Sequence, residues 1–160
     1  MISGCATAAL FAAGAAAQIV QLNPLSRTTG VPHDAIAAAK AWLDVIDADK
    51  PDLAWSQAGA FFQSSITTKD WIERVDELHR KFGHVRARSF VSADAATEMP
   101  DAPSGRYWVL HFSTLGYRRG INETVTVQQL DDGWKVAGFF ARNSRAIRIR
   151  GVGALPMRWK

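Results

Sequence analysis

Few side chains in this sequence of 160 residues are suited to acid–base chemistry, and His111 is the best placed of them. Alternation along its segment would put His111 on the same strand face as Tyr107, and a histidine base beside a tyrosine is a recurring acid–base arrangement. The opposite face carries Trp108 and Phe112 and therefore has the heavier apolar load. If that face is the core, His111 lies outside and is inert; otherwise His111 or Asp44 could serve as the base of a small enzyme.

The other polar residues form no recognisable reaction centre. Glu123 could pair with His111 across two strands, although an exposed ion pair is the commoner outcome for such neighbours. His33, His79 and His84 lack the spacing of a zinc site, so we expect no metal and no cofactor. There is also no glycine-rich phosphate loop between a strand and a helix, and no recognisable Ser-His-Asp arrangement. The sequence therefore names no reaction.

The first half of the chain has the period of amphipathic helices. Apolar residues recur there at spacings of three and four, which gives each segment one apolar stripe. Pro51 supplies a helix start, Thr67 can cap a later helix, and Gly83 supplies a left-handed stop. We therefore predict three helices, over residues 33–50, 51–62 and 67–83.

After Gly83 the apolar period changes to about two, which is the period of strands. We predict four antiparallel strands, over residues 85–93 and 107–114 and in a hairpin over 123–140 that turns at Asp131–Gly133. Because helices precede strands, the fold class is α+β, with three N-terminal helices packed on a curved four-stranded antiparallel sheet. On the last strand, alternation predicts that Trp134, Val136, Gly138 and Phe140 share one face.

A curved sheet that faces helices leaves room for a pocket between them. Gly138 would let the last strand bend or a helix approach closely. Each aromatic side chain near that pocket is also explained as core by its amphipathic spacing alone. The candidate lining residues of an aromatic groove are Trp42, Trp55, Trp71, Tyr107, His111 and Trp134.

The chain divides into a leader, a linker, one domain and a basic tail. Residues 1–17 have an apolar run and an Ala-x-Ala ending, which is typical of a secretory signal peptide, although no basic residue precedes the run. Residues 18–32 read as a linker, 33–142 as the α+β domain and 143–160 as the tail. We expect a periplasmic or secreted protein, or a membrane-associated one if the leader is not cleaved.

Positive charge is concentrated at the end of the chain. The net charge is +4, and the last nineteen residues contain six basic side chains and no acidic one. Such a tail could contact an anionic surface, whereas nucleic acid is not expected for an exported chain; a solvated extension is the alternative. A homodimer through the outer sheet face would use Trp108 or Phe139 as its apolar patch.

Three quoted segments resemble a bacterial family called domain of unknown function 4019. They are "AAAKAWLDVIDADKPDLAWSQAGAFFQSSITTKDW", "RARSFVSADAATEMPDAPSGRYWVLHFST" and "ETVTVQQLDDGWKVAGFFAR", within roughly residues 35–142. The resemblance implies an exported protein with a cone-shaped cystatin-like or nuclear-transport-factor-2-like α+β fold. It implies no activity, so it assigns no functional residue.

Two functional hypotheses remain from the sequence. The favoured one is a non-catalytic binding or interaction module whose aromatic groove holds an unknown small apolar ligand or a protein segment. The alternative is a small acid–base enzyme, similar to an isomerase or a dehydratase, that uses His111.

The tail can be tested separately from the domain. Deletion of residues 143–160 should abolish salt-sensitive binding to vesicles that contain anionic lipid, because it removes positive charge that screening by salt would weaken. Vesicle co-sedimentation at increasing salt concentrations measures this effect. Equal binding by the truncated and full-length chains would rule out a role for the tail.

Overall fold

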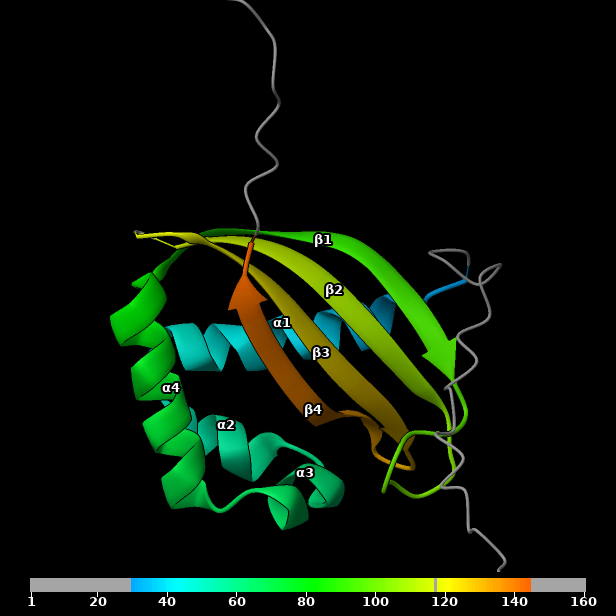
Figure 1. The fold of residues 1–160 in the computed structure, drawn as a ribbon. Coiled ribbons are helices and arrows are strands. Elements are labelled where there is room, and N and C mark those ends of the chain that lie inside the picture. The colour runs from blue at the N-terminus through cyan, green and yellow to red at the C-terminus, as the bar shows by residue number, and fades with distance from the viewer. Residues whose placement is uncertain (1–29, 117, 145–160) are drawn as a thin grey trace, which may run out of the picture.

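The computed structural model describes residues 30–116 and 118–144, which form an α+β domain and confirm the predicted fold class (Figure 1). The predicted leader, most of the linker, and the tail from residue 145 lie outside the described residues. Within the described ranges, no helix is both long and apolar enough to span a membrane. The elements are α1 (His33–Asp47), α2 (Pro51–Gln57), α3 (Ala60–Ser65), α4 (Thr68–Phe82), β1 (Val85–Ala96), β2 (Tyr107–Gly116), β3 (Gly120–Leu130) and β4 (Gly133–Asn143).

The strands form one antiparallel sheet in the order β1-β2-β3-β4, so each strand pairs with its neighbours in sequence. Figure 1 shows the sheet bent over α1. In this view α4 lies beside β4, and α2 and α3 lie below the sheet. β1 and β4 are the two edge strands. Both edge strands contain bulges: Arg86 and Val91 are the extra residues of β1, and Ala137 is the extra residue of β4.

The second predicted helix is wrong as a single helix, because it is interrupted at Ala58 and Gly59 between α2 and α3. The Gly59 N–H donates to the Val136 carbonyl oxygen of β4 at 2.8 Å. A Cβ at Gly59 would lie 3.2 Å from that same oxygen, so glycine permits this close approach of the helix junction to the sheet. The Gln63 amide then donates to three carbonyl oxygens near the end of α2, which satisfies that helix end.

The predicted ends of α4 are confirmed. Thr67 accepts a hydrogen bond from the Asp70 N–H at 3.2 Å, as an N-cap does. At the other end, Gly83 has a φ of 75°, and its N–H donates to the His79 carbonyl at 2.8 Å. α4 is therefore fixed at both ends by local sequence.

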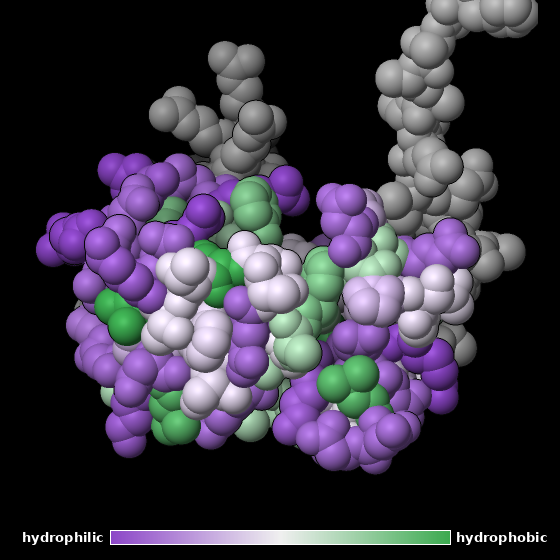
Figure 2. Space-filling view, turned by 90° about the horizontal axis from the view of Figure 1, so that it is seen from below, coloured by the Kyte–Doolittle hydropathy of each residue, from purple (hydrophilic) through white to green (hydrophobic). Residues whose placement is uncertain are grey.

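The core lies between α1 and the concave face of the sheet. The Trp108 face of β2 points into this core, with Leu110 and Phe112 buried beside it. Trp108 therefore does not form the outer patch that was expected for a dimer, and nor does Phe139, which packs against the core. Figure 2 shows a mainly hydrophilic surface on the side seen from below, with separate hydrophobic patches and a hollow between two raised parts.

The bulge in β4 reverses the alternation that the sequence predicted for this strand. Val127 pairs with Val136, but Thr126 pairs with Gly138, so Ala137 is extra. Because one extra residue exchanges the two faces of a strand, Trp134 and Phe140 do not share a face. Phe139 turns inward instead, and Phe140 turns outward and is 60% exposed.

A buried ion network joins α1 to the sheet. Arg88 of β1 donates from Nε to Glu123 Oε2 at 2.7 Å and from Nη1 to Asp47 Oδ2 at 2.7 Å. Its Nη2 contacts the second oxygen of each carboxylate, and Thr114 donates to Glu123. Glu123 is 2% exposed and lies opposite Phe112, so it faces the core and is not the partner of His111.

The two carboxylates of the network stabilise the charged form of Arg88. Burial alone would lower the pKa of Arg88, but hydrogen bonds to Glu123 and Asp47, together with their charges, raise that pKa above its ordinary value. Arg88 therefore stays charged, and each carboxylate has a bidentate partner.

Replacement of Glu123 alone should destabilise the domain far more than simultaneous replacement of Arg88 and Glu123. Glu123→Leu should lower the free energy of unfolding by about 3–5 kcal/mol, because it leaves the buried Arg88 with only Asp47 and leaves Thr114 without its acceptor. Urea unfolding of the single variants and of the Arg88→Met/Glu123→Leu double variant measures the coupling. Additive losses in the double variant would contradict a coupled ion pair.

Candidate functional site

Three of the proposed lining tryptophans connect the helices to one another. Each donates its indole N–H to a backbone carbonyl oxygen of another segment, which is how a buried tryptophan satisfies its polar atom. Trp42 is 4% exposed and Trp71 is 3% exposed, so neither presents its ring to solvent. Trp42, Trp55 and Trp71 donate to the carbonyl oxygens of Ala54, Ile66 and Pro51, at 2.7, 2.9 and 2.9 Å respectively.

The rings of Trp42 and Trp71 belong to one aromatic cluster. Their centroids are 5.4 Å apart, and Phe62 of α3 contacts both rings edge to face. Phe139 of β4 completes the cluster at 5.6 Å from Trp42 and 5.8 Å from Trp71. This cluster packs α1, α3 and α4 against β4. Its rings are therefore part of the core beneath the β4 edge of the sheet and do not form an open groove.

Two further proposed lining residues are buried elsewhere. Trp134 is 8% exposed and belongs to the core near the start of β4. Tyr107 is 1% exposed, and its hydroxyl donates to the Pro103 carbonyl in the loop between β1 and β2. Burial raises the pKa of Tyr107. The six proposed residues are therefore not gathered at one place.

His111 lies on the outer face of the sheet, on the side away from Trp108. Its Nε2 is 3.3 Å from Asp94 Oδ2, and its Nδ1 is 3.2 Å from Thr124 Oγ1. The second residue proposed as a base, Asp44, is exposed on α1, across the sheet from His111. The structure thus gives His111 a carboxylate partner but does not bring the two proposed bases together.

A hollow of about 230 Å³ lies between α4 and the edge strand β4. Its walls are mainly apolar, with the inward ring of Trp71 at its base and the exposed ring of Phe140 at its rim. Charged side chains are present only on the α4 side, where Lys81 Nζ lies 5.4 Å from the centroid of the Phe82 ring. The α4–β4 groove is lined by Trp71, Arg74, Val75, Glu77, Leu78, Lys81, Phe82, Phe139, Phe140 and Ala141.

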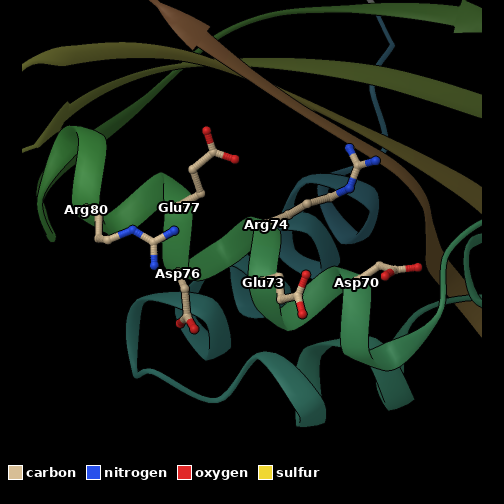
Figure 3. Close-up of a pocket in the computed structure, with 6 residues that line it drawn as sticks. All are labelled: Asp70, Glu73, Arg74, Asp76, Glu77 and Arg80. Atoms are coloured by element: carbon tan, nitrogen blue, oxygen red, sulfur yellow. The ribbon is translucent and has the colours of Figure 1, made fainter.

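A second, shallow hollow of about 660 Å³ lies along the exposed side of α4. Figure 3 shows its six charged residues spreading outward from the helix, with Arg74 and Glu77 extending toward the strands and Asp76 extending away from them. Side chains that diverge in this way do not converge on a ligand. Arg74 and Glu77 also line the α4–β4 groove, so they form a charged border between the two hollows.

One group of residues that could hold a metal was missed by the sequence reasoning. Asp49 follows α1, His79 lies in the last turn of α4, and His84 precedes β1; one ligand atom from each lies within 4.8 Å of the other two. Local spacing could not reveal this group, because folding brings Asp49 next to residues that are thirty or more positions later.

The comparisons with known proteins identify a family but no activity. The sequence profile of a family described as "Protein of unknown function (DUF4019)" matches residues 38–139. No curated protein and no solved structure matches this chain.

Ionisation of Tyr107 should destabilise the domain at alkaline pH. The folded state holds the phenol proton more tightly than the unfolded state, because burial raises the pKa of Tyr107 above its ordinary value of 10.0. The contribution of Tyr107 to the free energy of unfolding is therefore fully present below about pH 10, and it is lost as the pH rises through the pKa of the folded state. Unfolding free energies between pH 8 and 12 should fall less steeply for Tyr107→Phe, and equal slopes would contradict the assignment.

Proposed function

Because the chain belongs to the DUF4019 family, whose description assigns no function, we propose its role from the structure: it is a non-catalytic binding module whose α4–β4 groove holds an apolar segment of a partner protein. The observation that carries this proposal is a mainly apolar hollow beside an edge strand, with Phe140 60% exposed at its rim. A single exposed apolar side chain is ordinary on a protein surface, so the proposal rests on Phe140 lying beside the apolar walls of the groove.

The size of the groove favours a protein segment over a whole small molecule. Pockets for small molecules usually have volumes of about 300–1,000 Å³ and enclose most of the ligand. The α4–β4 groove, at about 230 Å³, is smaller and open, so it suits one or two anchoring side chains of a longer segment.

The position of the groove gives that segment a backbone to pair with. Among the residues that the structure describes, β4 pairs only with β3, so its other side is an edge of the sheet. The α2–α3 junction covers the start of this edge, where Gly59 binds the Val136 carbonyl. The later residues Phe139, Phe140 and Ala141 line the groove, so an extended segment there could add to the sheet while its side chains enter the hollow.

The charged border of the groove favours acidic residues beside the anchoring side chains. Of the charged side chains that line the groove, Arg74 and Lys81 are positive and Glu77 is negative, so the lining has a net positive charge on the α4 side. Acidic flanking residues would contribute mainly to orientation and association rate, because exposed charge pairs add little affinity.

His111 supports the enzyme alternative less well. It lies on the outer face of the sheet and lines neither of the two hollows described above. Its contacts with Asp94 and Thr124 satisfy both ring nitrogens, as in an ordinary hydrogen-bonded surface histidine.

The groove can be tested with peptides selected from a phage-displayed library of random twelve-residue sequences. Selected peptides should have apolar anchors, and Phe140→Asp should weaken their binding about tenfold or more, as measured by fluorescence polarisation, because it places a charge at an exposed apolar contact that the bound peptide would cover. His111→Ala should leave the affinity unchanged.

Val91→Asp is the matched control for this experiment. Val91 is 58% exposed on β1, at the opposite edge of the sheet, so the same charge is introduced at a similar exposure. Equal loss of peptide binding in both variants, or none in Phe140→Asp, would show that the peptides do not occupy the α4–β4 groove.

A further inference from the structure

We propose that Asp49, His79 and His84 form a site for a divalent transition-metal ion, with zinc as the expected occupant. The two histidines direct Nδ1 toward the same carboxylate oxygen: His79 Nδ1 is 3.2 Å and His84 Nδ1 is 3.8 Å from Asp49 Oδ1. Ligand atoms about 2.0–2.1 Å from a tetrahedral zinc ion lie roughly 3.3 Å from one another. The His79 separation of 3.2 Å is close to that value, and the His84 separation of 3.8 Å is longer. All three ligand atoms lie within 4.8 Å of one another, so a small rotation of the exposed side chains would bring them into range.

Hydrogen bonding accounts for only one of these two contacts. The His79 contact at 3.2 Å is within hydrogen-bonding range, but the His84 contact at 3.8 Å is too long. The two imidazole rings are nevertheless close, with their centroids 5.0 Å apart. A cation between the two Nδ1 atoms and the carboxylate would explain why both rings point to one oxygen.

The backbone fixes the three ligand positions independently of a metal. Asp49 has a φ of 57°, and its N–H donates to the Ile46 carbonyl at 3.0 Å, which closes the end of α1. Gly83 lies between the two histidines and ends α4 through its bond to His79. The site is therefore assembled from two helix ends, and little backbone freedom would be lost when a metal binds.

The electrostatic surroundings favour a cation. α1 and α4 both end at the site, and helix C-termini carry partial negative charge. Asp47 is also near in sequence, but it is already bound to Arg88 through both of its carboxylate oxygens. Asp49 is therefore the carboxylate that remains for a metal at this position.

The ligand set suits zinc better than calcium or magnesium. Two imidazole nitrogens and one carboxylate oxygen are typical of zinc and similar transition metals, whereas calcium and magnesium prefer oxygen ligands alone. Three protein ligands leave a fourth position for water, and the exposed side chains of Asp49 (64%) and His84 (57%) give access from solvent. A bound ion would connect the α1–α2 turn to the junction between α4 and β1.

Calorimetric titration of the chelator-stripped full-length chain with zinc chloride tests the site. A Cys5→Ser background removes the only thiol, which would otherwise compete for zinc. One zinc ion should bind per chain, and His84→Gln and Asp49→Asn should each weaken binding by at least about tenfold, since even the loss of a residue that only orients a ligand costs 10–100-fold. Zinc should also raise the melting temperature of the parent chain and not those of the variants.

His33→Gln and His111→Gln are the matched controls, because both histidines lie outside the cluster. Circular dichroism should show that all variants fold, since the replaced Asp49 and His84 side chains are exposed. Zinc binding weaker than about 100 µM, or equal affinity in the cluster variants and the controls, would overturn the proposal. Neither result depends on the α4–β4 groove.

Discussion

The buried guanidinium of Arg88 is the constraint on which the arrangement of helix and sheet depends. It joins the end of α1 to β1 and β3 through two carboxylates, one of which is almost fully buried. A buried charge is costly unless it is fully paired, so α1 must end where Asp47 can reach Arg88. The same requirement fixes Asp49, two residues later, and His84, four residues before Arg88, and so helps to bring the proposed metal ligands together.

The aromatic cluster and the bulge in β4 together produce the groove. Ala137 is accommodated as an extra residue, which turns Phe139 onto the rings of Trp42 and Trp71. Phe140 then has no place in the core and lies at the groove rim. A single inserted residue thus exchanges which phenylalanine is structural and which is available for contact.

Periodicity in the sequence predicted the features that depend on local chain geometry. The α+β class and the caps of α4 at Thr67 and Gly83 follow from spacing and residue type, and the structure confirms them. The spacing left open which face of β2 is the core, and the structure places the Trp108 face inward. The break at Gly59 had a sequence signal, a glycine within a helical pattern, but its cause is the distant carbonyl of Val136.

The candidate sites could not be predicted in the same way. Glu123 was expected in an exposed pair with His111, whereas it faces the core and is paired there with Arg88, a residue 35 positions earlier that no local pattern connects to it. Gly138 beside the bulge is a local sign that β4 bends, but it does not show that Ala137 is extra, and this extra residue moved Phe140 to the groove. The metal ligands and the two walls of the groove each come from segments that only the tertiary fold brings together.

The bulges at Val91 and Ala137 also limit how the sheet can grow. A straight outer strand offers a continuous row of unpaired N–H and C=O groups, on which identical chains can stack without end. Here Val91 interrupts one margin and Ala137 the other, and Gly59 occupies part of the second. Among the described residues, the edge of β4 beyond this junction is a short stretch of backbone, which could pair with a brief extended segment but offers little length for repeated stacking.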